Sequence, residues 1–204
     1  MDKIEILREH IKKEIRSFQV EDLLPSKQDN IEAAVVLSSW AIPAVLFVLW
    51  ANSYYPEVEY YQKAIREGFG PNLWNAIACF GLMAFGVAIS FSTFRMPARF
   101  AKKILMSAYA IGCLTFGLLV GQWFLLPLDQ LVWWQRGLFG ITSVFLLVVV
   151  LMYNVVLWYL GSLLYTESGD KTRFLKKVEM KSGEWRLFAG VVIFLLSVAV
   201  FLNA

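Results

Sequence analysis

The chain has 204 residues, of which 58% are hydrophobic and 17% charged, and its formal net charge is +3. Its mean hydropathy of +0.58 is higher than a soluble domain of this length can bury in one core. The composition therefore excludes a soluble globular domain and predicts a membrane protein. Its small positive charge needs no nucleic-acid partner as an explanation.

The N-terminal arm, residues 1–30, is predicted to be cytoplasmic and to contain an amphipathic helix. Between residues 3 and 18 apolar side chains recur at spacings of three and four, and the opposite face mixes glutamates with lysines and arginines. A helix that lies on anionic lipid is usually more one-sidedly basic, so the pattern fits a protein partner as well as the bilayer surface. The candidate partner-binding residues are Leu7, Ile11, Ile15 and Phe18.

Residues 31–204 are predicted to form an all-α membrane domain of five spans. A helix needs about 20 apolar residues to cross the bilayer core. Five segments qualify, at about 32–52, 73–94, 104–127, 136–164 and 185–202. Strands of a membrane barrel would alternate over about ten residues, whereas these segments are apolar on every face. Asp29 is expected to cap the first span, with Glu32 closing a capping box.

Two further amphipathic segments, 56–67 and 170–181, are expected to form short helices at the membrane surface. The aromatic residues around the first segment, together with Trp74, Trp123, Trp133 and Trp134, predict a belt at the outer interface. The alternative is that these aromatic residues line the mouth of a ligand site.

The distribution of lysine and arginine predicts the orientation. The five segments outside the spans carry 6, 2, 4, 1 and 6 of these residues in chain order. The positive-inside rule therefore places the N-terminus in the cytoplasm and the C-terminus outside. The cations of the second loop should also attract acidic phospholipid headgroups. The candidate cytoplasmic basic surface consists of Arg95, Arg99, Lys102, Lys103, Arg173, Lys176 and Lys177.

Asn154 interrupts the most apolar stretch of the fourth span. An amide facing lipid would lack hydrogen-bond partners, so Asn154 should face either another helix or a polar lumen, and helix packing is the favoured interpretation. Small residues on the second and third spans allow helices to approach closely, either within the chain or between copies. The candidate helix-packing or lumen residues are Asn154, Gly81, Gly112, Gly117 and Gly121.

The sequence contains no recognisable catalytic motif, and its spans have no aspartate, glutamate, lysine or arginine away from their edges. Cys79 and Cys113 are predicted to lie too far apart for a disulfide, and no cluster of ligands for a metal or cofactor is expected. The prediction is a non-catalytic membrane subunit or regulator, in the bacterial inner membrane or an equivalent one, that assembles with itself, another membrane subunit or a cytoplasmic protein. The alternative is an oligomeric pore or permeability effector.

Overall fold

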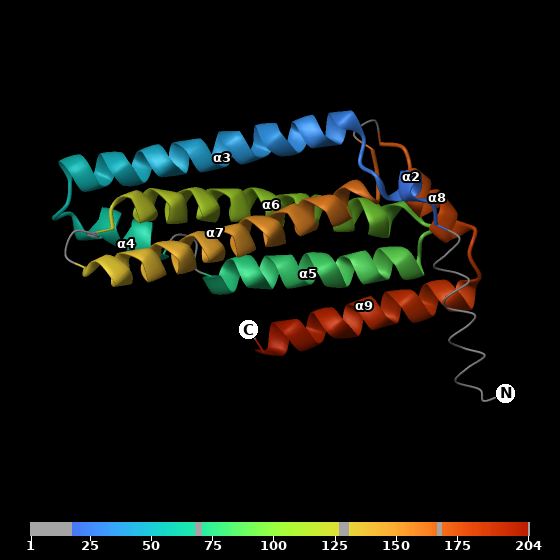
Figure 1. Cartoon of the computed structure of the whole chain (residues 1–204). Coiled ribbons are helices and arrows are strands. Elements are labelled where there is room, and N and C mark those ends of the chain that lie inside the picture. The colour runs from blue at the N-terminus through green and yellow to red at the C-terminus, as the bar shows by residue number, and fades with distance from the viewer. Residues whose placement is uncertain (1–17, 68–70, 127–130, 167–168, 204) are drawn as a thin grey trace.

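The computed structural model describes residues 18–67, 71–126, 131–166 and 169–203, which form helices joined by turns (Figure 1). Leu7, Ile11 and Ile15 lie outside the described residues. Five of the described helices are long and apolar enough to span a membrane, which confirms the predicted number of spans. The helices are α2 Val20–Leu23, α3 Lys27–Tyr54, α4 Glu59–Glu67, α5 Pro71–Ser90, α6 Arg95–Phe124, α7 Trp133–Ser162, α8 Arg173–Glu179 and α9 Gly183–Asn203.

Helix α6 is the centre of the bundle. It packs against α3, α5 and α7, while α9 packs against α5 (Figure 1). Three alanines of α6, Ala98, Ala101 and Ala108, are wholly buried. Because small side chains let helix axes approach closely, α6 can accommodate neighbours on three sides. Below, the end of the bundle that carries α2 and α8 is called the α8 end, and the opposite end the α4 end.

Helices α5 and α9 are offset from the other three spans. Trp74, near the start of α5, donates from Nε1 to the carbonyl oxygen of Ala108 at 3.2 Å. Helix α6 continues from Ala108 to Phe124, so it extends about 24 Å past this contact at 1.5 Å per residue. Figure 1 shows α3, α6 and α7 reaching further toward the α4 end than α5 and α9 do.

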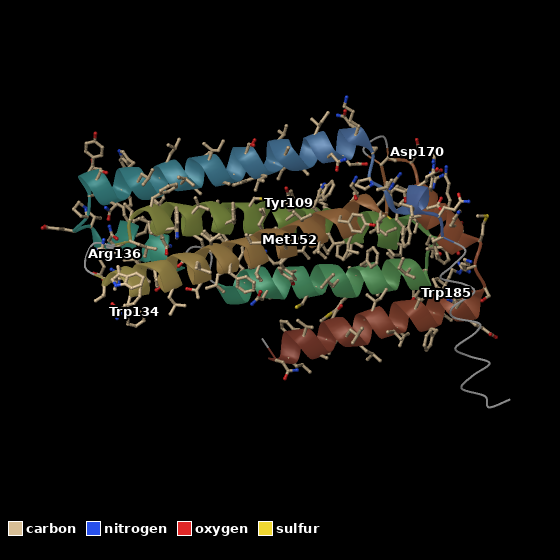
Figure 2. The ribbon with its side chains drawn as sticks, viewed as in Figure 1. Tyr109, Trp134, Arg136, Met152, Asp170 and Trp185 are labelled. Carbon is tan, nitrogen blue, oxygen red and sulfur yellow. The ribbon has the colours of Figure 1, made fainter. Side chains whose placement is uncertain are left out.

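This offset removes Trp74 from the predicted aromatic belt. Its ring contacts Tyr153 of α7, with the centroids 5.3 Å apart. Ala108, its hydrogen-bond partner, precedes Trp123 by 15 residues of α6, or about 22 Å along the axis. Trp134, by contrast, lies at the α4 end, and Trp185 lies at the α8 end (Figure 2). The belt prediction fails for Trp74 because sequence gives no information on the relative height of packed helices.

The first span begins earlier than predicted, and Asp29 is not its N-cap. Ser26 occupies that position: its hydroxyl accepts from the Asp29 backbone N–H at 3.1 Å, and Asp29 Oδ2 accepts from the Ser26 backbone N–H at 2.9 Å. This reciprocal pair is a capping box in which aspartate takes the place usually held by glutamate or glutamine. The third span likewise begins at Arg95, because arginine and lysine are good helix formers outside the apolar segment.

Helix α7 contacts its neighbours mainly near the α8 end. Its buried residues are Asn154, Leu157, Trp158, Gly161 and Ser162. Toward the α4 end its side chains are exposed, with Ile141 at 72% and Phe145 at 65%. A Cβ atom added at Gly137 or Gly140 would meet nothing within 4 Å. This half of α7 therefore presents an apolar surface to whatever surrounds the bundle.

Candidate functional site

The buried amide of Asn154 packs against Gly112 of α6. Asn154 is wholly buried, and its Nδ2 donates to the carbonyl oxygen of Val150 in its own helix at 3.1 Å. Its Oδ1 has no hydrogen-bond partner in the described part of the chain. A Cβ atom at Gly112 would lie 1.7 Å from this oxygen. The absence of a side chain at residue 112 thus creates the space that the amide occupies.

The other predicted glycines also form contacts within the chain. Gly117 and Gly121 of α6 pack on α3: a Cβ at Gly117 would meet the Ala41 carbonyl oxygen at 2.4 Å, and one at Gly121 would meet Val48 Cβ at 2.7 Å. Gly81 of α5 packs on Leu105 of α6, where an added Cβ would lie 3.0 Å from a side-chain methyl. Gly117 and Gly121 form a GxxxG element, which therefore joins α6 to α3 of the same chain.

A further close contact, between α5 and α9, was not predicted from the sequence. A Cβ at Gly190 would lie 2.0 Å from Ser90 Oγ and 2.4 Å from the Gly86 carbonyl oxygen. Gly86 and Ser90 are four residues apart, a spacing typical of close helix pairs in membranes. That spacing was the available signal, but nothing in the sequence identifies Gly190 of α9 as its partner.

The α8 end carries an ordered surface built on helix α8. Thr172 caps α8 by accepting from the Leu175 backbone N–H at 3.2 Å, and its hydroxyl donates to the Leu163 carbonyl oxygen after the end of α7. Leu175 and Val178 are wholly buried in the core shared with α5 and α6. One face of this short helix therefore fixes it to the bundle, which leaves the opposite face exposed. We call α2, α8 and the turns around them the platform.

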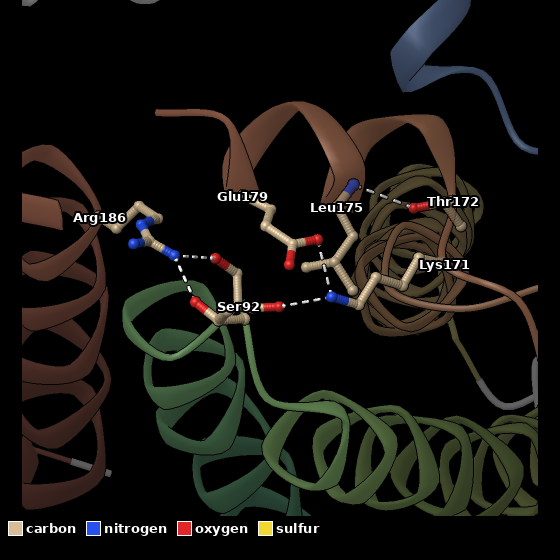
Figure 3. A network of polar contacts seen from close by, with 7 residues as sticks. Ser92, Lys171, Thr172, Leu175, Glu179 and Arg186 are labelled. Carbon is tan, nitrogen blue, oxygen red and sulfur yellow. Dashed lines mark hydrogen bonds and ion pairs between the residues drawn. The ribbon is translucent and has the colours of Figure 1, made fainter. Parts of the chain in front are cut away.

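A polar network joins the platform to the turn between α5 and α6 (Figure 3). Lys171 Nζ donates to the Ser92 carbonyl oxygen at 3.0 Å and forms an ion pair with Glu179 at 2.8 Å. Arg186, at the start of α9, donates from Nη1 to the hydroxyls of Ser92 at 3.1 Å and Thr93 at 2.8 Å. Ser92 is wholly buried, so the network holds three separate chain segments together.

The N-terminal arm is anchored at this platform through Phe18. Its ring lies 5.6 Å from that of Phe174 and 6.4 Å from that of Trp185, and Lys181 Nζ lies 5.5 Å from its centroid. Four residues later, Asp22 of α2 accepts from Lys177 of α8. This hydrogen bond and the lysine charge lower the pKa of Asp22 below its ordinary value. Phe18, predicted to contact a partner, thus packs within its own chain.

The predicted basic residues are divided between bound and exposed positions. Lys102 Nζ donates to the Tyr165 carbonyl oxygen at 2.8 Å, and Lys177 is paired with Asp22. The Arg99 guanidinium lies 5.6 Å from the centroid of the Tyr165 ring. The remaining four, Arg95, Lys103, Arg173 and Lys176, are exposed. All seven come from α6 or α8, so the fold gathers them at the α8 end.

The fold and composition together define a helical membrane protein with several spans. Among the described residues no group of three or more histidines, cysteines or carboxylates lies close enough to hold a metal ion. Cys79 and Cys113 are both buried free thiols, as the sequence predicted. No protein-family model matches the chain, and no curated protein or solved structure shows significant similarity to it.

Proposed function

We propose that the chain is a non-catalytic subunit or regulator of a membrane assembly, in the bacterial inner membrane or an equivalent one. It presents its N-terminal arm, from a fixed base on the platform, to a partner protein. The observation that carries this proposal is the packing of Phe18 on Phe174 and Trp185. An amphipathic helix held at one end loses less freedom on binding than an untethered one, so anchoring favours recruitment.

The contacts between spans support assembly more than conduction. Gly117 touches the backbone of α3, and Gly190 touches the backbone of α5. Helices at such separations leave no room for water between them along these seams. Asn154, the polar residue that could line a conduit, fills the space beside Gly112. The described chain is therefore closely packed around α6, as a scaffold or regulatory subunit requires.

The second candidate, an oligomeric pore or permeability effector, is favoured by the exposed half of α7. Ile141 and Phe145 belong to an apolar surface without a neighbour in this chain. Copies could meet along this surface, whereas the glycines of α6 are already occupied by α3 and α7. A pore would then have to be lined by surfaces between copies.

The test compares particle composition with membrane flux. The full chain is purified in mild detergent from membranes of its source organism, and native mass spectrometry determines which subunits accompany the 23.3 kDa protein. We expect a second protein in fixed ratio, lost when Leu7, Ile11 and Ile15 are all replaced by serine. The matched control replaces Val20 and Leu24 by serine and should retain the partner. These two apolar side chains, in and directly after α2, are 72% and 64% exposed.

The same preparations, reconstituted into dye-loaded vesicles, separate the two candidates. A subunit or regulator should leave the vesicles sealed. A homo-oligomer that releases dye, and whose composition is unchanged by the three serine substitutions, would contradict recruitment and establish the pore.

A further inference from the structure

An apolar groove opens on the side of the bundle between α5 and α6. Its volume is about 730 Å³. Ile77 and Phe80 of α5 form one wall, Phe100 and Ile104 of α6 the other, and Phe201 of α9 also borders it. The rings of Phe80 and Phe100 meet edge to face with centroids 6.3 Å apart. Such walls suit a hydrocarbon chain and offer little to a polar ligand.

Lys103 joins this apolar groove to a basic pocket. It lines the groove, and together with Arg99, Lys102 and Tyr165 it also lines an adjacent pocket of about 340 Å³. Two of these cations are available for a ligand. Within the described residues the Lys103 ammonium has no hydrogen bond or ion pair, and Arg99 contacts the Tyr165 ring without a carboxylate partner.

The sequence of α5 and α6 contains no acidic residue that could offset this positive charge. No aspartate or glutamate occurs between Glu67 and Asp129, a segment that contains all of α5 and α6. From Ile104 to Phe124, α6 has no ionisable side chain except the thiol of Cys113 and the phenol of Tyr109. Lys103 therefore marks the boundary between the charged and apolar parts of α6. Its long side chain can reach the headgroup layer from there.

We propose that this groove and pocket form a binding site for one anionic phospholipid. Arg99 and Lys103 bind its phosphate, and an acyl chain lies between α5 and α6 along Phe80 and Ile104. An acidic headgroup matches these two cations, neither of which has a carboxylate partner within the described residues, whereas a zwitterionic headgroup brings a positive charge of its own beside them. The proposal does not rest on partner recruitment, because no described residue of the N-terminal arm lines the groove or the pocket.

Native mass spectrometry of the full chain in mild detergent tests the proposal with phosphatidylglycerol and phosphatidylcholine of equal chain length. The wild-type protein should retain phosphatidylglycerol preferentially. Each cation near an acidic lipid is worth about a fivefold change in affinity, so R99Q/K103Q should reduce the preference about thirtyfold. The single change Lys176→Gln removes an exposed charge from α8 and should leave this preference unaltered.

The groove is tested separately with the charges intact. Ser107→Trp fills it from α6, while Thr142→Trp places the same residue on the exposed side of α7. Only Ser107→Trp should lower retention of phosphatidylglycerol. Glycerol 3-phosphate, which has the phosphate without acyl chains, should not displace the bound lipid.

Four results would overturn the lipid site. Equal retention of the two lipids by the wild type would show that it does not select charge. An equal loss per charge removed in Lys176→Gln and R99Q/K103Q would show attraction to net charge alone. Equal behaviour of the two tryptophan variants, or displacement by glycerol 3-phosphate, would show that the groove holds no chain. If R99Q/K103Q does not fold, Lys103→Gln alone and the tryptophan pair still decide the question.

Discussion

The contact between Gly112 and Asn154 predicts a large effect from adding one methyl group. In Gly112→Ala the new Cβ would lie 1.7 Å from Asn154 Oδ1 and 2.6 Å from its Cγ, whereas ordinary contacts are 3.4–4 Å. Asn154 is wholly buried between α6 and α7, so its side chain can move aside only by disturbing the packing around it. Overpacking of this kind costs about 1 to 3 kcal/mol of unfolding free energy.

The matched control is Gly137→Ala, on the same helix as Asn154, where an added Cβ meets nothing within 4 Å. Both substitutions gain about 1 kcal/mol of helix propensity, so the difference between them isolates the packing cost. Unfolding of the purified chain in mixed micelles, followed by tryptophan fluorescence, measures both free energies. We expect Gly112→Ala to be less stable than Gly137→Ala by about 1 to 3 kcal/mol.

A double-mutant cycle identifies the amide as the cause. Asn154→Ala removes the atoms that the new methyl group would meet, so Gly112→Ala should cost much less in that background. Coupling below about 0.5 kcal/mol, the usual limit of additivity, would refute the reasoning, as would equal stability of the two alanine variants. Asn154→Leu keeps the shape and removes the unpaired acceptor, so it should change stability by less than about 2 kcal/mol.

Three further predictions concern other parts of the fold. Gly190→Ala would place a Cβ 2.4 Å from the Gly86 carbonyl oxygen, so it should lower the thermal midpoint more than Gly112→Ala, because backbone yields less than a side chain. The lowered pKa of Asp22 means that its pairing with Lys177 contributes fully above about pH 4. That contribution should disappear as the pH falls through the folded-state pKa, and an Asp22→Asn variant should lack this pH dependence in the same unfolding assay. Reporter fusions after residues 20, 98 and 175 should read cytoplasmic, and fusions after 62, 130 and 204 external; an external reading at 98 or 175 would contradict the orientation.

The five spans were predictable from hydropathy and segment length alone. A run of about 20 apolar residues can satisfy its backbone hydrogen bonds in lipid only as a helix, so length and composition sufficed to predict five of them. The sequence also indicated a capped start for the first span, although Ser26 rather than Asp29 is the N-cap residue. The sequence was enough to predict that Asn154 avoids lipid, because an amide side chain needs hydrogen-bond partners whatever its neighbours are.

Which helices pack together, and how far each is shifted along the bundle axis, became known only from the three-dimensional fold. The sequence allowed Gly117 to face a second copy of the chain, but it packs on Ala41 of α3. Gly190 packs on Gly86, a pairing that the sequence of neither helix indicates. The same holds for Trp74, which an interfacial pattern placed near Trp123 but which lies beside Ala108. Inside a bilayer every apolar face is equally compatible with lipid, so hydropathy does not distinguish a face that packs from one that stays exposed. Close contact between complementary surfaces fixes the register instead, and that complementarity exists only once both helices are in place.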